Sequence, residues 1–156
     1  MLNREWIEAR IPHKGTMCLL DAVHSHSEDE IVCSAVSHRS PENPLRDESG
    51  LGIVAGIEYA AQAMAVHGAL RNGGSAPTGG GYLVSARDVT WSVQRLDLLH
   101  DPLSIRAQRL SGGASTIMYR FAVHAGADEI LSGRATVILD AASIDPSLHQ
   151  PGTEVS

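Results

Sequence analysis

Two residues of this chain carry side chains that can move protons, and both lie in unusual surroundings. His13 follows a proline in a loop punctuated by Pro and Gly, and Glu58 lies inside an otherwise apolar stretch. An imidazole and a carboxyl group can act as base and acid near neutral pH, which removal of a proton next to a carbonyl group requires. In a dry pocket, burial would favour the uncharged acid form of Glu58 over the opposing effect of a helix N-terminus. We therefore expect His13 and Glu58 to form an acid–base pair.

The element that must hold Glu58 is a long helix. Between residues 53 and 71, apolar residues follow helical spacing, and the remaining faces are also small or apolar. A helix that is apolar nearly all round is buried nearly all round. Strand-like runs with short polar connections, which indicate antiparallel neighbours, lie at residues 17–23, 30–36, 82–93, 103–110, 116–124 and 130–139. We predict an α+β hotdog fold, in which a curved antiparallel sheet wraps around one long central helix.

Length and composition fit one domain. The chain has 156 residues and a formal net charge of −6, with no run of Lys or Arg. This predicts one hotdog domain over residues 1–140, a polar, frayed tail over residues 141–156, and no nucleic-acid partner. No apolar run reaches the ~18 residues of a membrane span, and the start lacks the apolar region of a signal peptide. We expect a cytoplasmic protein that does not enter a membrane, with Cys18 and Cys33 as buried reduced thiols.

The sequence shows no cluster of Cys and His at the spacing of metal ligands. His24 and His26 are two residues apart, but they lie in a polar turn, where solvated histidines are the simpler interpretation. There is also no Gly-rich phosphate loop after a strand, and the only lysine, Lys14, is not placed for a Schiff base. We expect neither a metal nor an organic cofactor.

Three segments together resemble the family of beta-hydroxyacyl-acyl-carrier-protein dehydratases. Residues 11–23 resemble the family's Leu-Pro-His-Arg-Tyr-Pro-x-Leu-Leu-Val-Asp-x-Val segment, residues 58–62 its Glu-Ala-x-Ala-Gln helix segment, and residues 82–89 the strand that follows. Each motif is short, but their order and spacing make the combination specific. With residues 38–46 and 56–68 included, the pattern is most similar to the small dehydratases of aryl-polyene biosynthetic clusters, which resemble a fatty-acid pathway that makes conjugated chains.

This resemblance implies elimination of water from a 3-hydroxyacyl thioester. In the family, a histidine takes a proton from the carbon next to the thioester and a carboxyl group protonates the departing hydroxyl, and these roles fall on His13 and Glu58. Gln62 lies four residues after Glu58 on the same helix face and would orient the carboxylate or the substrate. Backbone N–H groups at the helix start would bind the enolate oxygen. We place substrate binding there and in the preceding polar loop, at Gly52, Ile53, Val54 and His38.

Two departures from the family pattern concern this pocket. The family usually has Pro-Gly before its helix, with the glycine amide facing the thioester carbonyl. Counted back from Glu58, that position is Ile53, preceded by Gly52. The tyrosine and proline that usually follow the catalytic histidine are replaced by Gly15 and Thr16. We expect a different loop geometry and a reshaped pocket mouth.

The resemblance also implies partners. The acyl group would be carried on the phosphopantetheine arm of an acyl carrier protein. Because the net negative charge of this chain cannot attract an acidic carrier as a whole, we expect a local patch of Lys14, Arg39 and Arg46 to dock it. We also expect a homodimer, or a higher oligomer, in which His13 of one protomer meets Glu58 of the other. Pairing between exposed strand edges would form this dimer.

Two other functions remain open at this point. A hotdog acyl thioesterase shares the fold and can carry a carboxylate on the central helix, but it hydrolyses the thioester. The Pro-His loop favours dehydration instead. A non-catalytic acyl-binding partner subunit would result if the two departures disrupt the geometry of His13 and Glu58. Activity on a 3-hydroxyacyl thioester distinguishes the three functions.

Overall fold

One antiparallel sheet and one long helix account for most of the ordered elements. The computed structural model describes residues 1–73, 81–113 and 115–139, so the predicted tail over residues 141–156 lies outside the described residues. The helices are α1 (Arg4–Glu8) and α2 (Ala55–Arg71), and two 3₁₀ turns are η1 (Gly15–Met17) and η2 (Ser37–Arg39). The strands are β1 (Leu2–Asn3), β2 (Ala22–His26), β3 (Glu30–Ala35), β4 (Gly81–Trp91), β5 (Leu103–Gly112), β6 (Thr116–Ala125) and β7 (Asp128–Leu139).

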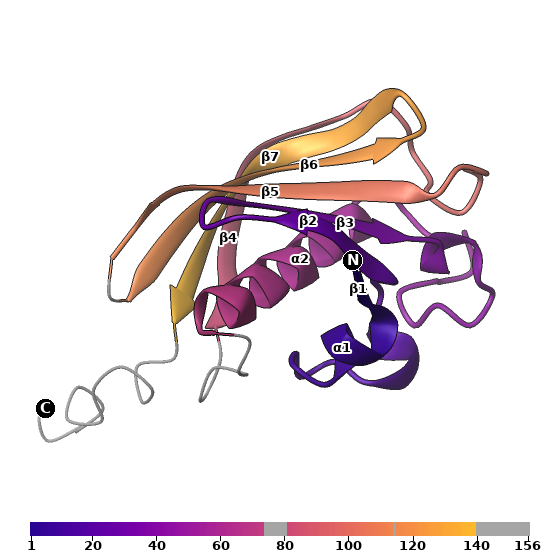
Figure 1. Cartoon of the computed structure of the whole chain (residues 1–156). Coiled ribbons are helices and arrows are strands. Elements are labelled where there is room, and N and C mark those ends of the chain that lie inside the picture. Colours follow the sequence, from indigo (N-terminus) through magenta and orange to yellow (C-terminus); the bar gives the residue numbers. More distant parts are fainter. Residues whose placement is uncertain (74–80, 114, 140–156) are drawn as a thin grey trace, which may run out of the picture.

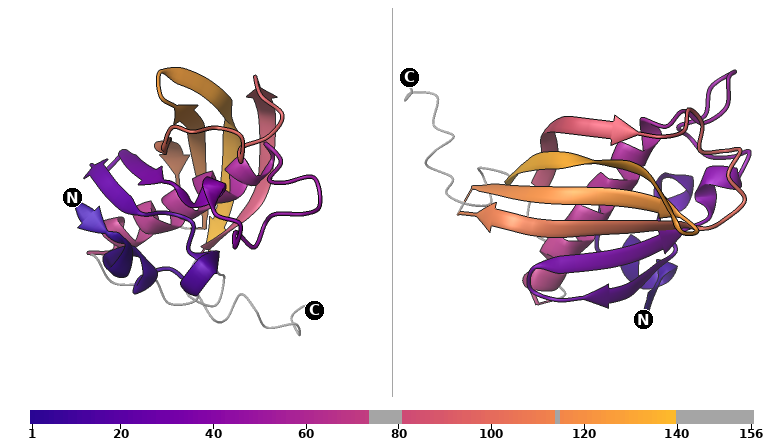
Figure 2. Two further views of the ribbon diagram at one scale, coloured as in Figure 1. Left: turned by 90° about the vertical axis from the view of Figure 1, so that its right-hand side faces the viewer. Right: turned by 90° about the horizontal axis from the view of Figure 1, so that it is seen from above.

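The strands form a single sheet in the order β1-β2-β3-β5-β6-β7-β4, and neighbouring strands are antiparallel. The sheet curves around α2, which lies along its inner face (Figures 1 and 2). This arrangement confirms the predicted α+β hotdog fold. The sheet order leaves β1 and β4 at the two edges.

Side-chain alternation explains why the sheet covers the helix. In β6, Tyr119, Phe121 and Val123 are buried towards α2, while the residues between them are open to the other face. A period of two is that of a strand with one covered face. The described part of the sheet therefore has an apolar inner face and a polar outer face.

Helix α2 carries mostly small and apolar side chains and approaches the sheet closely at Gly56. It begins at Ala55, two residues later than predicted, and buries Tyr59, Ala63 and Val66 completely. At Gly56, an added Cβ would come within 2.5 Å of the Leu131 side chain of β7. A larger residue at position 56 would therefore force the buried Leu131 side chain to move.

The predicted strand over residues 17–23 is wrong in its position. Residues 18–21 are irregular and β2 begins only at Ala22, so His24 and His26 belong to this strand rather than to the turn. His24 Nε2 lies 2.7 Å from Ser34 Oγ on β3. Residues 18–20 are buried as an apolar run, and a short apolar run does not by itself distinguish a strand from a packed loop.

Three smaller observations concern other parts of the chain. Cys18 and Cys33 are buried and free of disulfide bonds, as expected, and burial raises the pKa of the Cys33 thiol to about 12. The two-residue strand β1 was not predicted. Within the described residues, none of the helices has the length and apolar character needed to cross a membrane.

Candidate active site

His13 lies in the segment between α1 and η1 and is half-buried. Its Nδ1 atom is buried and has no hydrogen-bond partner among the described residues. Buried polar atoms in folded proteins are nearly always hydrogen-bonded, and among the buried side-chain nitrogen and oxygen atoms of the described residues only His13 Nδ1 and His38 Nδ1 lack a partner. The half-buried imidazole of His13 therefore has one nitrogen without a hydrogen-bond partner.

Residues of helix α1 form hydrogen bonds to the loop that carries His13. Arg4 donates a hydrogen bond to the Gly15 carbonyl over 2.8 Å, and the Gly15 amide donates to the Glu8 carboxylate over 2.8 Å. Gly15 has φ +59°, a conformation that glycine adopts without strain. This explains physically why a glycine occupies a position where the related family has a larger residue.

Helix α2 fastens the other side of the loop through Leu19. Gln62 is buried, its Oε1 accepts the Leu19 amide over 2.8 Å, and its Nε2 donates to the Met17 carbonyl over 2.7 Å. Gln62 therefore bonds to the backbone of the loop and makes no hydrogen bond to Glu58. This corrects the predicted role of Gln62, because its polar atoms lie on the helix face that meets the loop.

A chain of hydrogen bonds holds the carbonyl of the same residue. Ser37 Oγ donates to the Leu19 carbonyl over 2.7 Å and lies 2.7 Å from the Tyr59 hydroxyl, while Asn43 Nδ2 lies 3.1 Å from that hydroxyl. A hydroxyl has one hydrogen to donate, so the donors run in order from Asn43 through Tyr59 and Ser37 to Leu19. Burial raises the pKa of Tyr59. We call these residues, together with Gln62, the Leu19 clamp.

Sequence reasoning did not predict this clamp. A tyrosine inside a buried helix needs a partner for its hydroxyl, and Tyr59 is such a residue. That requirement was the one available indication, but the sequence alone does not identify Ser37 and Asn43 as the partners.

Glu58 lies on the first turn of α2, directly before Tyr59, and its side chain is exposed. It has no hydrogen bond or ion pair within the described part of the chain. The expected burial of Glu58 is therefore wrong for the single chain. Residues on this side of α2 are small or apolar, but the sheet does not cover them, so composition suggested a burial that the chain alone does not provide.

The helix start offers a different backbone donor from the one predicted. The Ile53 amide donates to the Gln94 carbonyl over 3.0 Å, so the expected role of this N–H is wrong in this conformation. The Val54 amide has no acceptor among the described residues, and Val54 is 64% exposed at the N-terminal end of α2. Gly52 is exposed beside it and pairs with Arg95 in an isolated bridge.

Asp97 fixes the loop that leads into this helix start. Its carboxylate accepts the Leu51 amide over 2.9 Å and two guanidinium hydrogen bonds from Arg95. The hydrogen bond from Arg95 is the main reason that the pKa of Asp97 is lowered. Arg46 lies 3.9 Å from the same carboxylate and also donates to the Ser40 carbonyl over 2.9 Å.

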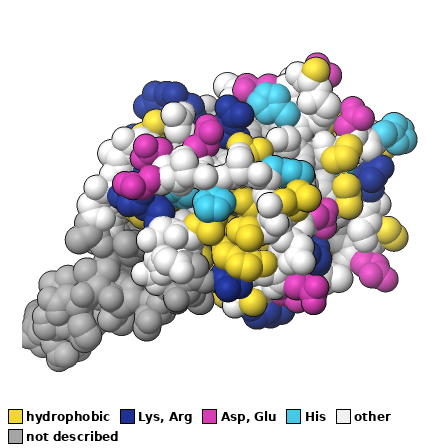
Figure 3. Space-filling model, viewed as in Figure 1, with side chains coloured by type: hydrophobic (Ala, Val, Ile, Leu, Met, Phe, Trp, Pro, Cys, Tyr) yellow, Lys and Arg dark blue, Asp and Glu magenta, His cyan; other side chains and the backbone are white. Residues whose placement is uncertain are grey.

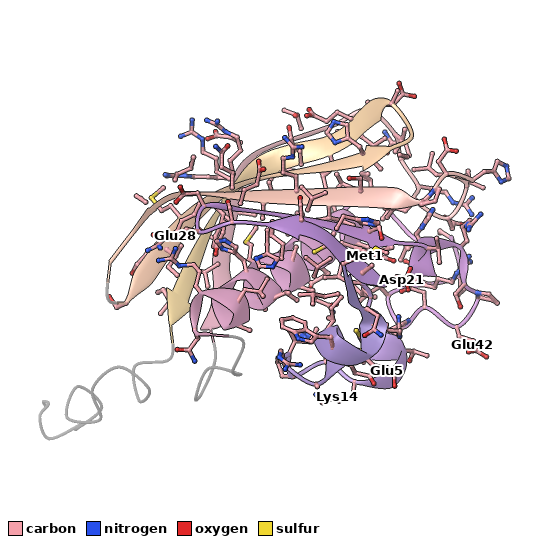
Figure 4. The ribbon with its side chains drawn as sticks, in the orientation of Figure 1. Met1, Glu5, Lys14, Asp21, Glu28 and Glu42 are labelled. Atoms are coloured by element: carbon pink, nitrogen blue, oxygen red, sulfur yellow. The ribbon has the colours of Figure 1, made fainter. Side chains whose placement is uncertain are left out.

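The other predicted contact residues are already engaged within the chain. His38 is fully buried, and its Nε2 lies 3.1 Å from the Leu99 carbonyl. His38 is thus closed off from solvent in the single chain, its Nδ1 has no partner among the described residues, and its role at the substrate stays a prediction. Lys14 donates to the carbonyls of Glu8 and Ile11, on the helix side of the sheet (Figure 4). Arg39 is exposed and donates to the His100 carbonyl over 2.8 Å.

A second buried polar pair lies near the other end of α2. His67 Nε2 is 2.9 Å from the Ser27 carbonyl, and its Nδ1 is 2.7 Å from the Tyr119 hydroxyl. Because a carbonyl only accepts, Nε2 carries the hydrogen and Nδ1 accepts from Tyr119. Desolvation lowers the pKa of His67 and raises that of Tyr119 to about 12. Both ring nitrogens of His67 are therefore hydrogen-bonded inside the chain, which is typical of a structural histidine.

No group of three or more potential metal ligands gathers anywhere in residues 1–73, 81–113 and 115–139. Within those residues, the site consists of an imidazole, an exposed carboxylate and backbone amides. Such groups can transfer protons and bind an oxyanion.

Solved structures with the same fold include both dehydratases and thioesterases. The dehydratase heterocomplex ApeI:P from Xenorhabdus doucetiae contains a chain with 19% sequence identity and a TM-score of 0.77, covering 92% of this chain and 97% of that one. Zebra fish thioesterase superfamily member 2 has 17% identity and a TM-score of 0.61, covering 88% and 95%. A thioesterase variant from Staphylococcus aureus has 14% identity and a TM-score of 0.57, covering 76% and 92%. At these identities the similarity establishes the fold.

The fold thus defines a hotdog protein. The chain belongs to the ApeP-like dehydratase family, because that family's model, described as ApeP dehydratase, matches residues 6–146. This confirms the family predicted from the sequence, including its aryl-polyene branch. No curated protein matches the chain.

Proposed function

We propose that this dehydratase removes water from a 3-hydroxyacyl thioester and releases a trans-2-enoyl thioester. The acyl group would be attached to the phosphopantetheine arm of an acyl carrier protein. The observation that supports this most strongly is His13, whose buried Nδ1 lacks a partner among the described residues and whose loop is hydrogen-bonded to α2 through Gln62. The reaction needs neither a metal nor an organic cofactor.

In this reaction His13 accepts the proton from the carbon next to the thioester carbonyl. The C–H electron pair then moves into the new double bond and the C–O bond to the hydroxyl group breaks. Glu58 supplies the proton that converts the departing hydroxide into water. Afterwards His13 releases its extra proton to solvent and the Glu58 carboxylate takes one up, which returns both groups to their starting states. General acid–base groups of this kind each contribute about 10²–10⁴-fold.

The negative charge that develops on the thioester oxygen requires a donor at the helix start. We assign this role to the Val54 amide, because Ile53 is engaged by the Gln94 carbonyl. The N-terminal end of the 17-residue helix α2 favours an anion at this position.

A second subunit would complete the site. Glu58 is exposed and the uncovered face of α2 continues from it, so in the single chain the carboxylate lies in water. We propose that the partner is a second copy, which brings its own His13 to this Glu58 through pairing at a strand edge. The similar chain in the ApeI:P complex belongs to a heterocomplex, which makes a related dehydratase subunit the alternative partner.

Mass spectrometry of a carrier-bound 3-hydroxyacyl thioester tests the reaction. Incubation with the protein should remove one water while the acyl group stays on the carrier. Release of the free acid would identify a thioesterase, and an unchanged thioester would identify a non-catalytic binding subunit; either result would refute the proposal.

Mixing two inactive variants tests the shared site. His13→Ala and Glu58→Ala chains are unfolded together, refolded and assayed, with each variant refolded alone as the control. If two copies share the site, the mixed dimer should regain up to half of the activity, because one of its two sites has both groups. A mixed dimer that forms and stays inactive would mean that each chain builds its own site.

A further inference from the structure

The outer face of the sheet carries three arginines that the strand register brings side by side. Arg134 on β7 lies directly opposite Arg120 on β6 and also directly opposite Arg87 on β4. Residues opposite each other in antiparallel strands point to the same face, and all three side chains are exposed. We call Arg87, Arg120 and Arg134 the arginine row.

The acidic residues near the row do not neutralise it. Continuing across the sheet, Arg120 faces Gln108 on β5, and Gln108 faces Glu30 on β3. Glu30 is two strands away from the row and lies 3.7 Å from Arg106. Within the described chain, none of the three arginines of the row forms an ion pair.

The neighbours along each strand do not compensate the charge either. The residues two positions before and after the row on β6 and β7 are neutral: Met118, Ala122, Ser132 and Thr136. Asp88 is the nearest carboxylate in sequence and lies at a β-bulge after Arg87, but it has no ion pair among the described residues. The row is therefore a local concentration of positive charge on a chain with a net charge of −6.

Such an arrangement costs stability. Like charges directly opposite each other on adjacent strands repel. The chain has 18 acidic residues, but within the described strands none of them lies directly opposite these arginines. Features that break a local rule of this kind are typical of functional surfaces. We infer that the row is kept for a partner with negative charge.

The position of the row separates it from the proposed active site. Arg120 and Arg134 alternate along their strands with buried residues of the inner face, so the row lies on the face of the sheet away from α2. Figure 1 shows α2 along the inner side of the curved sheet. Figure 3 shows basic side chains at the top of the molecule over these strands, bordered in front by acidic side chains. An anion bound there cannot reach Glu58 on α2, so the inference does not depend on the proposed function.

The shape of the surface indicates the kind of anion. Small ligands are enclosed by concave sites, whereas the row lies exposed on the outer face of a curved sheet. Neighbouring strands are about 4.8 Å apart, so the three arginines follow one another at a spacing close to the ~5–6 Å between side chains one helical turn apart. Arginine also binds carboxylates in a bidentate geometry. We propose that the arginine row docks an acidic helix of a partner protein.

A synthetic helical peptide with Glu on one face, at positions i, i+4 and i+7, is the probe for this surface. A peptide of the same composition with its Glu residues spread around the helix is the control for net charge. Binding is measured by fluorescence anisotropy at low ionic strength for the full chain, for Arg120→Gln and Arg134→Gln, and for Arg106→Gln. Arg106 is the matched control, because it is exposed on the same face but outside the row and near Glu30.

The peptide with Glu on one face should bind better than its isomer. Arg120→Gln and Arg134→Gln should each weaken the affinity for this peptide by up to about fivefold, which corresponds to one exposed ion pair. Arg106→Gln should change that affinity less. Equal losses for row and control variants, or equal binding of both peptides, would show attraction by net charge alone and overturn the proposal. Preferential binding to vesicles of anionic phosphatidylglycerol, with loss in the same variants, would overturn it in favour of a membrane.

Thermal unfolding gives a second measurement that needs no ligand. Removing the central charge by Arg134→Gln should raise the melting temperature, and added salt should narrow the difference by screening the repulsion. A lower melting temperature would mean that Arg134 stabilises the fold by its contacts, and would remove the reason for inferring a partner.

Discussion

Gln62 and Leu19 are 43 residues apart in the sequence and are joined by a buried hydrogen bond of 2.8 Å from the Leu19 amide to the Gln62 side chain. The same side chain holds the Met17 carbonyl. This bond fixes the loop of His13 to α2, the helix that carries the same chain's Glu58. In the proposed dimer, where His13 of one copy meets Glu58 of the other, it therefore sets where each chain presents His13 to its partner. Gln62 is therefore a positioning residue.

Replacing Gln62 by Met should lower kcat much more than it changes KM. A misplacement of about 1 Å in a catalytic group can cost about 10²-fold, and each backbone group left unsatisfied costs roughly 1–3 kcal/mol of stability. Steady-state kinetics and urea unfolding measure the two effects. Gln62→Glu should recover part of the activity, because it retains the acceptor for Leu19; a folded Gln62→Met chain with unchanged kcat would contradict the positioning role.

Tyr59→Phe should reduce kcat, whereas Tyr119→Phe should leave it nearly unchanged. Both tyrosines are buried, but the Tyr59 hydroxyl bonds to Ser37 and Asn43 in the Leu19 clamp, whereas the Tyr119 hydroxyl bonds to His67 alone among the described residues. Both variants should lose stability by about 1 kcal/mol or somewhat more. Equal effects on kcat would mean that the clamp contributes only to folding.

His13→Ala and Glu58→Gln should each lower kcat by about 10²–10⁴-fold while the chain stays folded. In the double variant the losses should not multiply, because residues that act as a unit are not additive. Circular dichroism and thermal unfolding verify the fold, and turnover of a 3-hydroxyacyl thioester measures the loss. Turnover close to that of the unmodified chain in either single variant would refute its assignment.

Stability should fall as the solution becomes more acidic than about pH 6.5. Desolvation lowers the pKa of His38 and His67 from the ordinary value of 6.5. Above that value both histidines are neutral in the folded and unfolded chains and contribute no pH dependence. Below it the unfolded chain takes up protons that the folded chain does not, until the lowered pKa is reached. Urea unfolding at several pH values should show this slope, and His67→Gln should flatten it. If the free energy of unfolding depends on pH equally in the unmodified chain and in His67→Gln, His67 does not cause the pH dependence.

Charge reversal at Arg39 should weaken turnover of the carrier-bound substrate more than turnover of a short pantetheine thioester. Arg39 is exposed, and the difference should shrink with salt because exposed charges are screened over ~10 Å at 0.1 M. Arg46→Glu should instead lose stability and activity on both substrates, because it places a carboxylate beside Asp97. Equal losses on the two substrates for Arg39→Glu would exclude it from docking.

The elements that follow a regular period were predicted from the sequence. Alternation in β3 and β6 and the apolar run of α2 gave their positions within a few residues, because each pattern reflects one covered face. The strand expected at residues 17–23 was wrong in its position, because the run from Cys18 to Leu20 is buried in a loop. Side chains bond to the backbone of this loop, in place of the backbone hydrogen bonds of a neighbouring strand.

The roles of His13 and Glu58 at the candidate site stay predictions, whereas the contacts of the residues around them differ from those expected. His13 and Glu58 stand out because their types are unusual in their surroundings. The exposure of Glu58 could not be predicted, since periodicity does not say which face of an all-apolar helix the sheet covers. The bonds of Gln62, Ile53 and His38 depend on partners far away in the sequence, and local spacing holds no information about them.

The hydrogen-bond chain that ends at Leu19 begins at the Asn43 amide and ends at a peptide carbonyl. Neither end takes up or releases a proton at neutral pH. This series of hydrogen bonds therefore supports the loop and does not conduct protons, although it contains two hydroxyl groups. In the proposed reaction, the proton that His13 takes up would therefore return to solvent by a route other than this hydrogen-bond chain.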